Sequence, residues 1–189
     1  MKMRKLLLAF VFIASTAIAN AQTFKKGDLD INAGLGLGYS YGFYSGSSAW
    51  PTLYASVEKG FFQIKDIGVI SIGGLLAYEH ISVSDLDYSW NDFYIGARAA
   101  FHFSQIKVEN LDLYAGISTG LRFYSYPVYN YVITSTYPYY DYTYENETHT
   151  TTFGGMFAGA KYFFTNNFGA FGELGYDVTY LKLGVTFKL

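Results

Sequence analysis

The chain has 189 residues, no cysteine and a formal net charge of −2. The lack of cysteine excludes disulfides, thiol catalysis and thiolate metal sites, and the charge balance excludes the basic footprint of a nucleic-acid-binding protein. Aromatic residues make up 21% of the chain and glycine is frequent, whereas there are only three prolines. Because aromatic residues favour strands and prolines interrupt them, this composition points to an all-β protein.

Residues 1–21 have the pattern of a secretory signal peptide. A basic start at residues 2–5 precedes an apolar run at 6–13, and Ala19-Asn20-Ala21 supplies a small-x-small cleavage site. The apolar run is far shorter than the roughly 20 residues of a membrane-spanning helix. We therefore expect cleavage after Ala21 and a mature domain over residues 22–189. Its formal charge is −5, because cleavage removes three of the 13 basic residues and none of the 15 acidic ones.

The segment from Leu29 to Phe43 alternates strictly between two kinds of residue. Every odd position is aliphatic, alanine or aromatic, and every even position is glycine, serine, asparagine or aspartate. A period of two is typical of a strand with two different faces. The second face is too small and too glycine-rich for a water-facing surface, and it suits the narrow interior of a barrel whose apolar face meets lipid. The segment therefore predicts a transmembrane β-barrel.

Eight segments continue this pattern along the chain, and we expect strands at 28–43, 52–61, 68–82, 88–103, 111–125, 151–163, 168–176 and 180–189. Each is long enough for the roughly 9–11 residues with which a tilted strand crosses a bilayer. Short turns alternate along the chain with a second set of connections between strands. The last connection of that second set is a long loop at about 126–150. This arrangement predicts an eight-stranded antiparallel up-and-down barrel with both termini in the periplasm and the long loop outside.

The long loop is rich in tyrosine, and its acidic residues have no lysine or arginine beside them. Because parts of it also read as strand, we expect a hairpin that extends two strands above the membrane. Two additional spanning strands, giving ten, are the alternative. Tyrosine makes adaptable contact surfaces at low entropic cost. The candidate external contacts are Tyr129, Tyr131, Tyr139, Tyr140, Tyr142 and Tyr144.

The last eight residues, Lys182-Leu-Gly-Val-Thr-Phe-Lys-Leu189, resemble the C-terminal assembly signal of bacterial outer-membrane proteins. The matching positions are Lys182, Gly184, Phe187 and Leu189, although phenylalanine is the more usual final residue. With the signal peptide and the eight strands, the mature chain resembles the small OmpA/OmpX-type barrels of Gram-negative bacteria. The resemblance implies a location in the cell outer membrane. It also implies that the barrel-assembly machinery reads the last strand and that outer-membrane lipid and lipopolysaccharide surround the wall.

Eight charged residues are expected on the inner face: Glu58, Glu79, Arg98, Asp112, Arg122, Lys161, Glu173 and Lys182. Four are acidic and four are basic, so we expect ion pairs that plug the lumen, with Arg98 and Arg122 at their centres. The alternative is a narrow ion pathway that these pairs gate.

Catalytic and metal-binding patterns are weak. His80-Ile81-Ser82, near Asp85, Asp87 and Asp92, faintly resembles the His-x-Ser of lipid-A deacylase barrels, and a polar rim at a strand end explains it better. The three histidines lack metal-ligand spacing. We expect a monomeric barrel without enzymatic activity, cofactor or metal that has a structural or surface-interaction role toward an unknown ligand. A narrow porin-like channel is the alternative, and a lipid-modifying enzyme is a more distant one.

Overall fold

The computed structural model describes residues 24–39, 47–83, 88–106, 108–133 and 140–189. The expected signal peptide lies outside these residues. Within them, no helix is long and apolar enough to cross a membrane. The described chain is built of nine strands: β1 (Leu29–Tyr39), β2 (Ser47–Ala49), β3 (Thr52–Ile64), β4 (Gly68–Val83), β5 (Tyr88–Phe103), β6 (Leu111–Ile133), β7 (Tyr140–Phe163), β8 (Phe168–Gly175) and β9 (Thr179–Lys188).

The strands form one closed antiparallel sheet. Its order is β2-β4-β3-β1-β9-β8-β7-β6-β5, and β5 also pairs with β4. The pairing of Leu29–Tyr39 with β9 joins the first and last strands of the wall, so that the strands leave no open edge around the barrel. The expected eight-stranded all-β barrel is confirmed, and the ten-stranded alternative is wrong.

The strand beyond the expected eight is β2. It is short, precedes β3 in the chain and pairs with the same neighbour, β4. It pairs with the end of β4 through Ser47–Val83, Ser48–Ser82 and Ala49–Ile81. Trp50 then donates its backbone N–H to the carbonyl of His80, and Pro51 separates β2 from β3. Because proline has no N–H to donate, it interrupts the ladder at this point.

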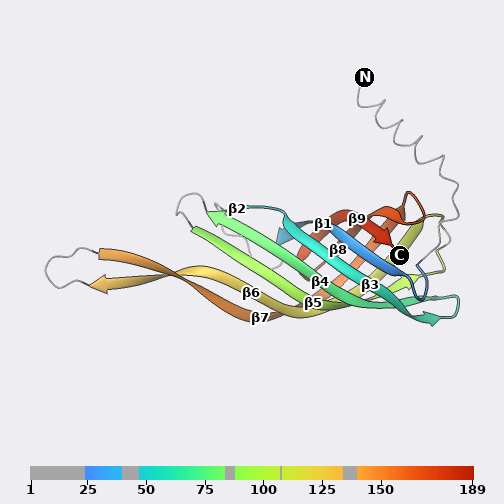
Figure 1. Cartoon of the computed structure of the whole chain (residues 1–189), viewed down its shortest axis with the longest axis horizontal. Helices are drawn as coiled ribbons and strands as arrows, with labels where there is room; N and C mark the ends of the chain where they lie inside the picture. Colours follow the sequence, from blue (N-terminus) through green and yellow to red (C-terminus); the bar gives the residue numbers. More distant parts are fainter. Residues whose placement is uncertain (1–23, 40–46, 84–87, 107, 134–139) are drawn as a thin grey trace, which may run out of the picture.

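Two strands are much longer than we expected. β6 and β7 pair in one uninterrupted register from Leu111–Tyr162 to Ile133–Tyr140, and in Figure 1 they project far beyond the rest of the wall. Most of the segment expected as a loop at 126–150 is therefore strand, which corrects that boundary. We call residues 126–133 and 140–148 the arm. The pairing supports the expected hairpin extension, because the arm continues the same two strands.

The two faces of the wall differ as the alternation predicts. In β3, Tyr54, Ser56 and Glu58 are buried inside the barrel, whereas Leu53 and Val57 are exposed on its outer surface. The largest buried apolar cluster lies in the lumen and contains Tyr54, Leu75, Ala77, Tyr94, Phe153, Phe171 and Val178. These side chains therefore pack against one another inside the barrel.

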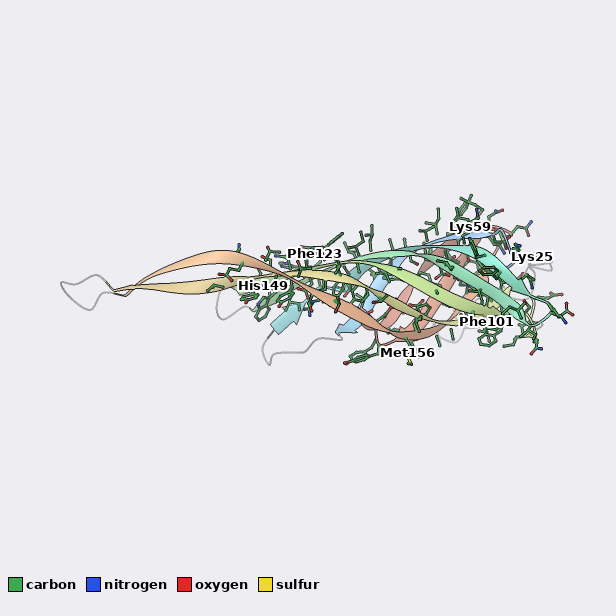
Figure 2. The ribbon with its side chains drawn as sticks, turned by 90° about the horizontal axis from the view of Figure 1, so that it is seen from below. Lys25, Lys59, Phe101, Phe123, His149 and Met156 are labelled. Carbon is green, nitrogen blue, oxygen red and sulfur yellow. The ribbon has the colours of Figure 1, made fainter. Side chains whose placement is uncertain are left out.

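The chain enters and leaves the wall at the end opposite the arm. Asp30 lies beside Lys188 in the β1–β9 pairing, and the turns after β3, β5 and β7 lie at the same end. Figure 2 shows Lys25, Lys59 and Phe101 toward this end, and Phe123 and His149 where the arm leaves the wall. We call this end the base.

Candidate functional site

The eight charged residues expected on the inner face all lie on the lumen side of their strands. Seven of them are buried, and Arg122 is half-buried. They do not form one cluster. Glu58, Arg98, Asp112, Lys161, Glu173 and Lys182 gather in the base and middle of the lumen, and Glu79 and Arg122 lie nearer the arm.

Arg98 joins the two halves of the larger group. Its guanidinium pairs with Glu58 through Nε and with Glu173 through Nη2, the latter at 2.8 Å. It also donates to the Tyr54 hydroxyl and lies 4.1 Å above the Phe157 ring centroid. A planar guanidinium with several fixed donors suits such a position, because a buried charge is tolerated only when it is paired and hydrogen-bonded.

Lys161 and Lys182 complete this network. The Lys161 ammonium donates to Asp30 Oδ2 at 2.8 Å and lies 3.4 Å from Glu58 Oε2. The Lys182 ammonium lies 2.6 Å from Glu173 Oε1. All of these side chains are almost fully buried. The network thus crosses the lumen from β1 through β3, β5 and β7 to β8 and β9.

The turn between β8 and β9 folds into the lumen, which the sequence did not indicate. Asp177 is buried, accepts from Ser118 at 2.9 Å and pairs with Lys182 at 2.5 Å. Val178 is fully buried in the apolar cluster. Gly155 permits this approach, since a Cβ there would overlap the Tyr176 carbonyl oxygen. The turn therefore packs inside the barrel, against Ser118 and Lys182.

A second, smaller group lies nearer the arm. Arg122 donates to Asp92 through Nε and Nη2. Glu79 accepts from the Thr52 hydroxyl at 3.1 Å and from the Tyr94 hydroxyl at 3.2 Å. Tyr94 is fully buried below this group and belongs to the apolar cluster. Aromatic and aliphatic side chains thus separate the two charged groups.

The inner face is more acidic than we expected. The predicted balance of four acids and four bases is wrong, because the inner face also carries Asp30, Asp92, Asp177, Lys188 and His102. The lumen has seven acidic side chains, five lysines and arginines, and one histidine. Four of the five additional residues follow from strict alternation, since each lies at an inward position of its strand. Asp177 lies in a turn, where alternation gives no information.

Ser71, His102 and Asp112 form a hydrogen-bonded chain in the base of the lumen. His102 Nδ1 lies 2.8 Å from Asp112 Oδ2, and Nε2 lies 3.0 Å from Ser71 Oγ. This connectivity is that of a serine-hydrolase triad. However, all three side chains are buried, and Nε2 also lies 3.6 Å from Glu58 Oε2. The arrangement fits a brace between β4, β5 and β6 better than an activated nucleophile.

The His80-Ile81-Ser82 segment lacks the expected acidic partner among the described residues. His80 Nδ1 lies 2.8 Å from Asn91 Oδ1, which also accepts from the Tyr78 hydroxyl at 2.7 Å. Asp92 lies on the other face of the wall with Arg122, and Asp85 and Asp87 lie outside the described residues. These contacts are those of a polar rim on the outer wall. Within the described part of the chain, no group of three or more histidine, aspartate or glutamate side chains is arranged to hold a metal ion.

The outer wall has three bands. Near the base, the exposed aromatic residues are Phe61, Phe62, Phe103, Phe164, Phe168 and Phe187; near the arm, they are Trp50, Tyr78, Phe93, Tyr176 and Tyr180. Between them, the exposed side chains include Ile31, Leu35, Leu53, Ile72, Leu76, Ile95, Ile117, Leu174, Leu183 and Val185. Met156 also projects from this wall in Figure 2. An apolar band between two aromatic girdles is the pattern of barrels that cross lipid bilayers.

The arm rises from a stack of aromatic rings. Tyr126 and His149 are stacked at 5.2 Å, Tyr124 and His149 at 5.6 Å, and the Arg122 guanidinium lies 5.1 Å from the Tyr124 ring centroid. Cross-strand aromatic pairs stabilise two-stranded sheet. The stack therefore supports the point at which the arm leaves the wall (Figure 2).

The candidate tyrosine contacts lie farther along the arm. Tyr129 lies opposite Tyr144, Tyr131 opposite Tyr142, and Tyr140 opposite Ile133 in the register. Tyr139 and the side chains of the other five lie outside the described part of the structure.

The last strand places the assembly-signal residues on both faces. Lys182 is buried in the lumen, and Phe187 and Leu189 are exposed on the outer wall. Gly184 faces inward, where a Cβ would overlap the Ala33 carbonyl oxygen of β1. Glycine at this position therefore permits close approach of β1 and β9.

No family model and no curated protein matches this chain. Nine chains of solved structures match it, among them the N-terminal β-barrel domain of Pseudomonas aeruginosa OprF. That match has a TM-score of 0.43 and 18% sequence identity, and covers 87% of this chain and 98% of that chain. The fold is that of a small OmpA/OmpX-type barrel, because eight antiparallel strands follow one another around a closed wall.

Proposed function

We propose that this chain is a monomeric outer-membrane β-barrel whose arm contacts a partner at the cell surface and whose lumen is closed. Outer-membrane lipid and lipopolysaccharide would surround the wall, and the barrel-assembly machinery would receive the last strand. Both termini would face the periplasm. We assign it no enzymatic activity and no cofactor. The three bands of the outer wall support insertion, because large exposed apolar surfaces mark contact with lipid or protein.

The observation that carries the surface role is the unpaired edge of β7. β8 pairs with β7 only as far as Phe157–Gly175, with one further backbone hydrogen bond from Tyr176 to Met156. Beyond this point, no described strand pairs with that edge. Exposed edges usually carry charged side chains, above all lysine, or proline or a bulge. From Tyr140 to Ala160, β7 has acidic residues but neither proline nor lysine, and its register has no bulge.

The partner that this edge suits is an extended basic segment. The backbone of β7 offers hydrogen bonds to an added strand. Residues 126–150 contain Asp141, Glu145 and Glu147 and no lysine or arginine. Two copies of the arm would repel each other, whereas a basic strand would be attracted. The opposite edge, beyond the last β5–β6 pair at Asn91–Ser125, has Pro127, which cannot donate a hydrogen bond.

Binding of an alternating threonine-lysine peptide to the folded protein tests this proposal. We expect saturable binding that weakens with salt, no binding of the matching threonine-glutamate peptide, and loss of binding when residues 127–146 are replaced by a short Gly-Asn linker. Equal binding by the shortened variant would contradict the proposal.

The narrow porin-like channel is the second candidate. The acidic excess in the lumen supports it, because a ring of carboxylates favours cations. Bilayer conductance of the refolded protein distinguishes the two, since a closed lumen predicts no large, steady current.

A further inference from the structure

Phe24 lies inside the base of the barrel, although it precedes the first strand. Only 1% of its surface is exposed, whereas Lys25, Lys26 and Gly27 are exposed. Its ring stacks on His102 with centroids 4.0 Å apart and an interplanar angle of 19°. The Lys161 ammonium lies 5.6 Å from the Phe24 centroid. The segment before β1 therefore turns one aromatic side chain into the lumen.

The pocket around Phe24 is built from several strands. The ring of His102 of β5 stacks both with Phe24 and with Tyr114 of β6, whose centroid lies 5.4 Å from that of His102. The Lys161 ammonium of β7 lies 5.0 Å from the Tyr114 centroid. Stacked rings and a nearby cation are favourable for an aromatic guest, since ring faces attract positive charge. The base of the lumen is thus a pocket suited to an aromatic side chain.

The backbone after Phe24 is fixed to the rim. Lys25 N donates to Asp28 Oδ2 at 2.9 Å, and Gly27 N donates to the Gly60 carbonyl at 2.9 Å. Gly60 N returns a hydrogen bond to the Asp28 carbonyl, also at 2.9 Å. A Cβ at Gly60 would overlap the Lys25 carbonyl oxygen, so glycine is needed there. Gly27 has a φ of +98°, which other residues rarely adopt.

We propose that Phe24 is a stopper that closes the base of the lumen. This role of Phe24 rests on the closed lumen proposed above. At this end of the barrel, one side chain bound in an aromatic pocket makes the closure. With Phe24 in place, water and small solutes from the base do not reach Ser71, His102 and the carboxylates behind them. Without it, the β8–β9 turn with Asp177 and Val178 still closes the lumen from the arm side.

Thiol labelling of two reporters tests this assignment, because the chain has no cysteine of its own. Ser71→Cys places a thiol beside His102, and Ser118→Cys places one beside Asp177. Each folded variant in detergent micelles is treated with a charged, membrane-impermeant methanethiosulfonate, and labelling is followed by mass spectrometry. We expect slow labelling at both positions when Phe24 is present. Phe24→Ala should accelerate labelling at position 71 by about tenfold or more and leave position 118 unchanged, as expected for local opening.

Two matched variants complete the test. Lys26→Ala alters the same turn at an exposed residue and should leave both rates unchanged. Phe24→Leu keeps apolar volume without stacking and should give an intermediate labelling rate at position 71. If Phe24→Ala does not fold, this rate is the test of the stopper. Fast labelling at position 71 with Phe24 present, or an unchanged rate in both Phe24 variants, would overturn the stopper. Fast labelling at position 118 alone would contradict the closed lumen and leave the stopper standing.

Discussion

Lys182 of β9 and Asp177 of the β8–β9 turn form an ion pair of 2.5 Å inside the lumen. Lys182 also lies 2.6 Å from Glu173, and Asp177 also accepts from Ser118. The contacts of Asp177 bind a turn that would otherwise lie at the rim to two strands of the wall, β6 and β9. The turn also brings Val178 into the apolar cluster, so that the ion pair helps to hold both Asp177 and Val178 inside the barrel.

Asp177→Ala should lower the free energy of unfolding by about 1–3 kcal/mol, because Ser118 and Lys182 each lose a buried partner while Lys182 keeps Glu173. The measurement is the urea midpoint at which the folded, fast-migrating band disappears from unboiled SDS gels. Asp66→Ala, in the exposed turn between β3 and β4, is the control and should leave the midpoint unchanged. Equal midpoints for Asp177→Ala and the unmodified protein would show that the turn is not held by this pair.

Arg98→Ala and Arg122→Ala should differ in severity. Arg98 is buried between Glu58 and Glu173, so its removal leaves two buried carboxylates each short of a partner, at a cost of about 3–5 kcal/mol. Arg122 is half-buried and therefore nearer to water, and its ion pair with Asp92 is less fully desolvated, so its loss should cost less. Urea titration gives the stabilities, and planar-bilayer recording gives the conductance, which both changes should raise. A smaller effect for Arg98→Ala than for Arg122→Ala would contradict its central position in the network.

Gly155→Ala should be destabilising by about 1–3 kcal/mol, because the new Cβ would overlap the Tyr176 carbonyl oxygen and displace the inward turn. Gly74→Ala is the matched control. The nearest atom to its Cβ, the Gly96 carbonyl oxygen, lies 3.4 Å away, which is ordinary contact. If both changes are tolerated equally, the turn does not approach β7 as closely as described.

Replacing residues 127–146 with a short Gly-Asn linker should leave the barrel folded. Only β6 and β7 pair within the arm, and the deletion keeps His149 in its stack with Tyr124 and Tyr126. The shortened protein should therefore keep its gel shift and its urea midpoint. Protease added to intact cells should cut the unmodified protein first within this segment. Failure of the shortened protein to fold would make the arm a part of the wall.

Residue alternation determined most of the fold because burial in a barrel wall has the same period as the strand. β5 begins and ends at the expected residues, Tyr88 and Phe103, and from Asp92 onward its outward apolar residues alternate with inward residues such as Arg98 and His102. The expected sixth strand was too short by 11 residues, from Tyr140 to Thr150. Outside the bilayer both faces of a hairpin meet water, so alternation between apolar and polar residues no longer marks a strand.

The residues that the sequence did not reveal lie where the chain is not a strand. Phe24 precedes β1, and Asp177 and Val178 lie in a turn, so no periodic pattern assigns them to a face. Their inward positions depend on Gly60 and Gly155, which are distant in sequence and permit close approach of the backbone. Partners along the lumen are equally remote, as Lys161 and Asp30 show. Such pairings follow from closure of the barrel and not from local sequence.

We propose that the chain is a closed barrel inserted in an outer membrane. The mobility of the protein from the carbonate-washed outer-membrane fraction in SDS gels, with and without boiling, tests both closure and insertion. We expect the protein to stay in that fraction and to migrate at one position unboiled and at another after boiling, because a closed strand ladder resists SDS until it is heated. Release of the protein by the carbonate wash, or identical migration before and after boiling, would contradict the account.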